Sequence, residues 1–164
     1  MGVVSEMQPS VVFDCMIFLQ ALGRSSGPSK RCFELLDQGQ IILHMSNAIQ
    51  SEIADVLSRP SVLRKFPDLA GPFAQQMLSA LWTRVRFTPN PPKCFSLPRD
   101  SDDEPYTDLA ISVRADYLVT WNDRHLTYLM RQDTPEGRGF CTRFPFLKIA
   151  DPVTFLREID RRVR

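Results

Sequence analysis

The feature of this chain that most restricts its fold is a series of short apolar runs, each followed by a stretch with helical spacing. Three such runs are Val11-Val12-Phe13, Ile41-Ile42-Leu43 and Tyr117 to Thr120. Continuous apolar runs of this length are typical of strands that are covered on both faces, and their alternation with helices favours a parallel sheet. We therefore predict an α/β protein with three layers, α/β/α, and a central, mostly parallel sheet.

The first helices are marked by their ends and by their apolar spacing. Pro28 and Gly39 bracket one predicted helix, and Ser46 is the expected N-cap of the next. In that second helix the apolar residues recur at helical spacing and predict a buried stripe, which consists of Ile49, Ile53, Val56 and Leu57.

The remaining segments give weaker patterns. Residues 60–85 are expected to be helical, with an amphipathic face made of Phe73, Met77, Leu78, Leu81 and Val85. A short strand is predicted near Cys94-Phe95, a glycine-rich loop at Glu136 to Gly139, and an edge strand at Leu147 to Ile149. Asp151 is expected to cap the last helix.

Length and composition are those of one domain. The chain of 164 residues is long enough for a single core, and we expect one domain over residues 1–164 with a flexible N-terminal segment at 1–10. A net charge of +1 gives no overall signature of nucleic-acid binding. The four cysteines form no CxxC pair, which favours free thiols in a reducing compartment, and no apolar run approaches a membrane span. We therefore expect a cytoplasmic protein.

Acidic residues occur where the predicted strands end or where the next helices begin. Asp14 directly follows the first run, Glu52 lies early in the helix after the second, the Asp103-Glu104 pair opens another helix, and Asp123 follows the third run. The carboxyl ends of parallel strands share one edge of the sheet. Carboxylates gathered there repel each other unless a cation lies between them. The pattern predicts a divalent-metal site, used for phosphodiester hydrolysis.

Each acid also has a simpler interpretation. Asp14 could cap a helix, Glu52 could be a solvated helix acid, residues 100–104 could form an exposed loop, and Asp123 could lie in a turn. For any one residue the simpler interpretation is favoured. For an ordered set along one edge, all four would have to hold together, which favours the metal site.

Two residues near the third run need separate interpretations. Trp121 could stack on a nucleic-acid base, which is worth roughly 1–3 kcal/mol per base, but we expect it to cover the core. His125 could contact RNA, but we expect a local hydrogen bond. A phosphatase or nucleotide-binding protein is disfavoured because neither GxxxxGK[ST] nor GxGxxG occurs in the chain.

Several blocks of the sequence together resemble the PIN domain, the nuclease fold of the VapC-like toxins of toxin-antitoxin systems. The blocks are Val11 to Asp14, Ser46 to Leu57, Arg99 to Ala110, Ala115 to Leu126 and Asp151 to Leu156. Members of the family use three or four acids to hold Mg²⁺ or Mn²⁺ and cut single-stranded RNA. Carried over by position, the metal site would consist of Asp14, Glu52, Asp103 or Glu104, and Asn122 or Asp123.

The resemblance implies roles for these residues. Asp14 would be the central metal ligand, assisted by Glu52 and by Asp103 or Glu104, and Thr120 would hydrogen-bond a carboxylate or a phosphate. The spacing between the third and fourth family acids places the fourth position on Asn122, an amide that can ligate a cation but brings no charge.

The implied function is that of a metal-dependent endoribonuclease, the toxin of a toxin-antitoxin pair. Its partners would be RNA and a cognate antitoxin that blocks the acidic cleft. The family also implies a homodimer, for which the helix from Phe73 to Val85 offers apolar surface. The alternative is a catalytically weakened PIN-like module that binds RNA or a protein partner, which Asn122 favours.

Overall fold

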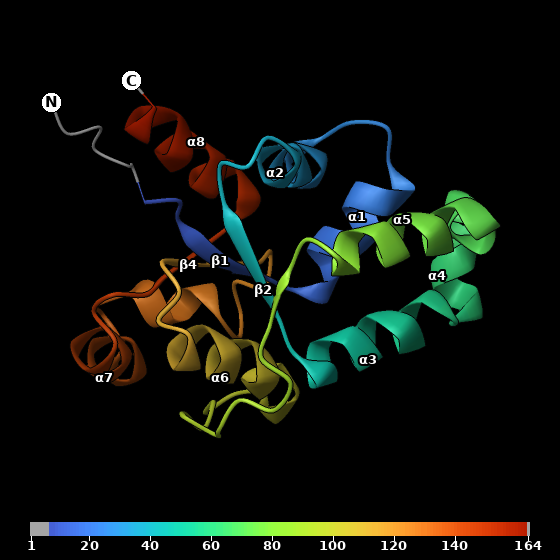
Figure 1. Ribbon diagram of the computed structural model, residues 1–164. Coiled ribbons are helices and arrows are strands. Elements are labelled where there is room, and N and C mark those ends of the chain that lie inside the picture. The colour runs from blue at the N-terminus through green and yellow to red at the C-terminus, as the bar shows by residue number, and fades with distance from the viewer. Residues whose placement is uncertain (1–6, 164) are drawn as a thin grey trace, which may run out of the picture.

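The computed structural model describes residues 7–163, and at its centre lies a sheet of five strands in the order β3-β2-β1-β4-β5 (Figure 1). Every pairing between these strands is parallel. The strands are β1 (Ser10–Phe13), β2 (Ile42–Met45), β3 (Arg86–Phe87), β4 (Tyr117–Val119) and β5 (Lys148–Ala150). Helices cover both faces of the sheet, so the predicted three-layer α/β/α fold is confirmed.

The α-helices connect the strands and continue to the C-terminus. They are α1 (Cys15–Gly23), α2 (Pro28–Asp37), α3 (Asn47–Leu57), α4 (Pro60–Lys65), α5 (Pro72–Trp82), α6 (Glu104–Ser112), α7 (Pro135–Arg143) and α8 (Pro152–Arg162). Three short 3-10 turns lie at Pro67–Ala70, Ser101–Asp103 and Thr127–Met130. In Figure 1, α1, α2 and α8 lie on one side of the sheet and α6 on the other, while α3, α4 and α5 extend beyond β2.

The strand register assigns the side chains to the two faces. Phe13 pairs with Val119, and its ring packs edge-on against Phe18 of α1, Phe33 of α2 and Phe155 of α8. Because side chains alternate along a strand, Val12 faces the α6 side. The residues of β1 from Val11 to Phe13 are at most 1% exposed, as expected for a central strand covered twice.

Polar caps fix the helices at the carboxyl ends of the strands. Asp14 caps α1, Ser46 accepts the backbone N–H of Ile49 at the start of α3, and Asp151 accepts that of Thr154 at the start of α8. The caps at Ser46 and Asp151 are the predicted ones. The predicted stripe of α3, from Ile49 to Leu57, is also confirmed, because all four of its residues are buried.

The prediction of a strand near Cys94-Phe95 was wrong. The backbone N–H groups of Cys94 and Phe95 both donate to Oδ1 of Asp108, at 2.8 and 3.3 Å, so they bind a side chain and not a neighbouring strand. The fifth strand is instead Arg86–Phe87, at the edge beside β2. It consists of one charged and one aromatic residue, both exposed, so no apolar run indicated this strand in the sequence.

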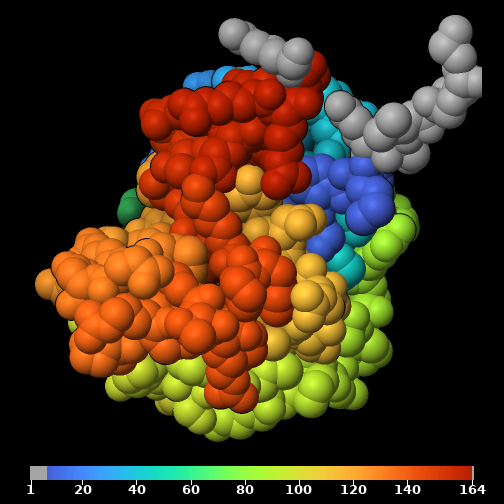
Figure 2. All heavy atoms as spheres, turned by 90° about the vertical axis from the view of Figure 1, so that its left-hand side faces the viewer, coloured from blue at the N-terminus to red at the C-terminus, as the bar shows by residue number. Residues whose placement is uncertain are grey.

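The predicted glycine-rich loop at Glu136 to Gly139 is also wrong, because these residues belong to α7. The side chain of Thr134 caps this helix by accepting the N–H of Gly137. A Cβ atom at Gly137 would lie 1.8 Å from the carbonyl oxygen of Arg131, so the glycine serves close backbone packing inside a helix. Figure 2 shows the face on which α7 (orange) and α8 (red) lie.

The predicted apolar face of the middle region holds only in part. Leu78 and Leu81 are buried on α5, but Phe73 is 65% exposed and its neighbour Ala74 takes the buried position. The helix ends at Trp82, so Val85 does not belong to it.

The ends of the chain and its thiols give three further findings. A flexible segment was predicted at residues 1–10. Residues 1 to 6 lie outside the described part of the chain, and Ser10 already belongs to β1. All four cysteines are free thiols. Within residues 7–163, no helix combines the length and the apolar character needed to cross a membrane.

Candidate metal centre at the carboxyl edge of the sheet

The order in which strands are added to the sheet reverses between β1 and β4, and Asp14 lies at this switch point. The chain moves from β1 to β2 and β3 on one side, and then to β4 and β5 on the other. Ligands of open α/β sheets bind in the crevice outside such a switch point. Asp14 follows β1 and Thr120 follows β4, and the hydroxyl of Thr120 donates a hydrogen bond to Oδ2 of Asp14.

Asp14 is a carboxylate in an environment that disfavours its charge. It is 8% exposed, and burial raises the pKa of its carboxyl group from 3.8 to about 6. The hydrogen bonds from Thr120 and from backbone N–H groups oppose this rise, while the charge of Asp103 adds to it. A cation beside Asp14 would offset the cost of its ionisation.

Glu52 is joined to the start of α1 through the hydroxyl of Tyr106. This hydroxyl donates to Oε2 of Glu52 at 2.5 Å and accepts the backbone N–H of Cys15 at 3.1 Å. Tyr106 comes from α6 and is 2% exposed, so its ring has little freedom to move. The carboxylate of Glu52 is therefore held near the backbone of Cys15, directly after Asp14, although Asp14 and Glu52 are far apart in the sequence.

Asp103 and Asn122 form a second hydrogen-bonded pair at this edge. Nδ2 of Asn122 donates to Oδ2 of Asp103 at 2.9 Å, and Oδ1 of Asn122 accepts the backbone N–H of His125 at 3.1 Å. The backbone N–H of Asn122 donates to the hydroxyl of Thr120 at 3.0 Å. The amide of Asn122 thus presents its NH₂ group to the acid and directs its carbonyl oxygen at the backbone.

These side chains share one cavity of about 330 Å³. It is lined by Asp14, Cys15, Met16, Glu52, Asp103, Tyr106, Trp121 and Asn122. Burial, together with the charge of Asp100, raises the pKa of the Asp103 carboxyl group to about 6. Within residues 7–163, no Lys or Arg forms an ion pair with any of the three acids of the cavity.

Two of the acids considered in the sequence point elsewhere. Glu104 accepts the backbone N–H of Leu97 at 3.1 Å and pairs with Lys93 at 3.1 Å. Asp123 is exposed and pairs with Arg131 at 3.0 Å. Neither lines the cavity, so the structure brings together Asp14, Glu52, Asp103 and Asn122 and leaves Glu104 and Asp123 outside.

His125 and Trp121 lie at the rim of the same site. Nδ1 of His125 is 3.1 Å from Oδ2 of Asp100 and 3.7 Å from Oδ2 of Asp103. Asp100, Asp103 and His125 each offer a ligand atom, and these atoms lie within 4.8 Å of one another. Trp121 is 41% exposed and does not have the buried, core-covering position that we expected.

Comparison with known proteins agrees with this architecture. A family model described as PIN domain matches residues 10–124, which is well over half of the chain. The chain belongs to the PIN domain family. The matched range contains all four polar side chains that meet in the cavity.

The fold of this PIN domain also occurs among solved structures. It is similar to the crystal structure of VapBC2 from Rickettsia felis bound to a DNA fragment from their promoter, with a TM-score of 0.52. The identity is 16%, and the match covers 87% of this chain and 98% of that chain. No curated protein matches the sequence.

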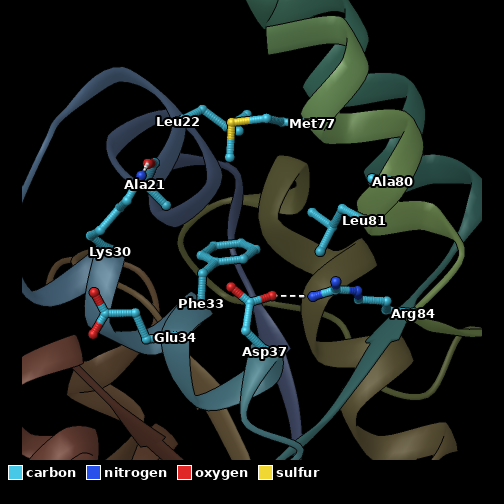
Figure 3. A pocket seen from close by; sticks show the side chains of 10 residues that line it. All are labelled: Ala21, Leu22, Lys30, Phe33, Glu34, Asp37, Met77, Ala80, Leu81 and Arg84. Atoms are coloured by element: carbon cyan, nitrogen blue, oxygen red, sulfur yellow. Dashed lines mark hydrogen bonds and ion pairs between the residues drawn. The ribbon is translucent and has the colours of Figure 1, made fainter. Parts of the chain in front are cut away.

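The PIN domain has a second cavity, of about 270 Å³, between α1, α2 and α5 (Figure 3). Phe33, Met77 and Leu81 point into it, and Asp37 forms an ion pair with Arg84 at its edge. This lining is largely apolar, and of its two acids, Glu34 and Asp37, the second is already paired with Arg84. The cavity therefore lacks the carboxylate cluster that a hard cation requires.

Two residues of the site and its rim, Tyr106 and Asp100, were not expected there from the sequence. Tyr106 is buried on α6 beside Leu109 and Ala110, so in the sequence it has the pattern of a core residue. Its hydroxyl reaches Glu52 across 54 positions of the chain, which no local pattern indicates. Asp100 belongs to the acidic segment 100–104, and its contact with His125 joins the loop before α6 to the loop after β4, which are far apart in the sequence.

Proposed function

We propose that this protein is a metal-dependent endoribonuclease that cleaves single-stranded RNA. The observation that carries the proposal is the meeting of Asp14, Glu52 and Asp103 in one cavity at the switch point of the sheet. Their oxygen atoms suit Mg²⁺ or Mn²⁺. No Lys or Arg of residues 7–163 neutralises them, and Asp14 is largely removed from water.

The protein groups would divide the work in the following way. Asp14, Glu52 and Asp103 would hold the cation, and Asn122 would orient Asp103 through its NH₂ group. A bound divalent cation supplies positive charge that activates a water molecule and offsets the charge of the phosphate. Tyr106 fixes the carboxylate of Glu52, and Thr120 fixes that of Asp14, so both acids are oriented before metal binds.

The first test is metal binding and cleavage by one pair of matched variants. Calorimetric titration with Mn²⁺ should show micromolar binding to the wild type and to Asp123→Asn, and little binding to Asp14→Asn. A labelled single-stranded RNA should be cut in Mg²⁺ by the first two proteins, and not by the third or in EDTA. The two substitutions make the same chemical change, but Asp123 lies outside the cavity. Equal cleavage by Asp14→Asn would remove Asp14 from the mechanism.

A second candidate function is a PIN-like module that binds RNA or a protein but has weak catalysis. Asn122 favours it, because an amide at this position adds no charge and its carbonyl oxygen is already bonded to the backbone of His125. If calorimetry detects no heat of Mn²⁺ binding at millimolar metal, and the protein binds RNA without cutting it, this candidate is favoured over the nuclease.

We further propose that the protein is the toxin of a toxin-antitoxin pair and forms a homodimer. The family and the shared fold with VapBC2 support a protein partner that covers the acidic cavity. The exposed Phe73 on α5 offers apolar surface for a second copy. Sedimentation should show a dimer for the wild type and a monomer for Phe73→Glu. The product of a short gene immediately upstream should bind the protein and stop cleavage.

A further inference from the structure

We propose that Trp121 is a stacking platform for an unpaired base of the RNA, next to the phosphate that is cut. This inference rests on the proposed nuclease function and adds to it the residue that holds the nucleotide. Trp121 directly follows Thr120 and lines the same cavity as Asp14, Glu52 and Asp103. A base on its ring would therefore lie beside the carboxylates.

The exposure of Trp121 separates it from an ordinary core residue. Its side chain is 41% exposed, whereas Trp82, the other tryptophan, packs against Phe18 with ring centroids 6.1 Å apart and is partly buried against the core. An indole that stays in water keeps much of its apolar area available for a ligand.

Hydrogen bonds hold the exposed ring in place. Nε1 of Trp121 donates to Oε1 of Gln20 at 2.8 Å, and the hydroxyl of Ser29 donates to the same oxygen at 2.7 Å. Ser29 is 3% exposed and belongs to α2, so the anchor of the indole reaches into the core. A side chain that is already fixed loses little conformational freedom when a ligand binds.

Met16 extends the apolar surface of the cavity. It is 37% exposed, and it lies four residues before Gln20 on α1, so both side chains are on the face of the helix that meets Trp121. The three acids repel phosphate, and no Lys or Arg of the described chain pairs with them. Stacking on Trp121 gives the cavity a way to hold a nucleotide that does not depend on charge.

The bases of a duplex are already stacked and paired, so a stacking platform of this kind selects single strands.

Tryptophan fluorescence gives the first test. In the variant Trp82→Phe, Trp121 is the sole tryptophan, so the fluorescence reports on the surroundings of Trp121 alone. With Ca²⁺ in place of Mg²⁺, a short single-stranded RNA should quench its fluorescence, and the matching duplex should not. Binding seen by anisotropy with no quenching would overturn the proposal.

Steady-state cleavage of a single-stranded RNA gives a second test. Trp121→Ala should raise KM about 5- to 150-fold with a much smaller change in kcat, and Trp121→Phe should retain part of the affinity. Gln20→Ala should raise KM by a smaller factor, because the ring remains but loses its anchor. Phe87→Ala is the matched control, since Phe87 is also 41% exposed but does not line the cavity.

The outcomes separate this inference from the proposed function. A wild-type protein that does not cut single-stranded RNA in Mg²⁺ contradicts the nuclease. A wild-type protein that cuts, beside a folded Trp121→Ala with unchanged KM, contradicts the platform alone. If Trp121→Ala melts early, Trp121→Phe and Gln20→Ala carry the test, and an unchanged KM for both contradicts the platform.

Discussion

The side-chain amide of Asn122 uses both of its ends, donating to Asp103 at 2.9 Å and accepting the backbone N–H of His125 at 3.1 Å. A carboxylate in this position could accept from His125 but could not donate to Asp103. Asn122 therefore relieves charge repulsion that an acid would add, and it fixes the orientation of Asp103 without a cation.

We expect Asn122→Asp to trade stability for metal affinity. Without metal, the new carboxylate faces Asp103, and the free energy of unfolding should fall by about 1–3 kcal/mol. With metal, the added charge should lower the Kd for Mn²⁺. Urea denaturation in EDTA and calorimetry measure the two effects. Asn90→Asp, in an exposed loop, should change neither. An unchanged stability and Kd would contradict this role of Asn122.

Asp14→Asn should leave the metal-free protein as stable as the wild type or more stable. The amide removes a buried charge and still accepts the N–H of Ile17 as the cap of α1. The gain at neutral pH should be at most about 3 kcal/mol, measured by urea denaturation in EDTA. A large loss of stability would contradict this prediction and show that the carboxylate of Asp14 stabilises the metal-free fold.

The stability of the metal-free protein should depend on pH between about 4 and 6. The folded pKa of Asp14 is about 6, above its usual 3.8, so the folded state binds this proton more tightly than the unfolded state. The resulting stabilisation is fully present below pH 3.8 and is lost as the pH rises through 6. Asp103 acts in the same direction but is more exposed. Urea curves at several pH values should show Asp14→Asn gaining on the wild type as the pH rises; parallel curves would contradict this.

Two tyrosines offer a matched pair of substitutions. Tyr106→Phe removes the hydroxyl that serves both Glu52 and the N–H of Cys15, and should lower the free energy of unfolding by about 1–3 kcal/mol. The hydroxyl of Tyr128 is also buried but finds no hydrogen-bond partner among residues 7–163, so Tyr128→Phe should be neutral or stabilising. Urea denaturation of both variants tests the assignment, and a larger loss for Tyr128→Phe would refute it.

The sequence was sufficient for the central strands, for two of the helix caps and for the edge of the sheet that carries the site. Apolar runs such as Val11 to Phe13 are buried strands, and Ser46 and Asp151 cap the helices as expected. These features depend on residues within a few positions of each other, which is why local patterns predict them.

The sequence was not sufficient for choosing between neighbouring acids. Successive residues on a helix point about 100° apart, so only one of Asp103 and Glu104 can face the cavity, and the turn that starts α6 decides which. Asn122 and Asp123 present the same choice in a loop. There, the contacts of Asn122 with Thr120 and Asp103 exist only in the folded chain.

The four cavity side chains come from positions 14, 52, 103 and 122 of a chain of 164 residues. A chain still on the ribosome therefore holds an incomplete set of these side chains until most of it has been synthesised. The pocket forms only when β1 and β4 pair, and β4 emerges late. A nuclease of the kind proposed would therefore be harmless to the RNA that encodes it until this pairing has taken place.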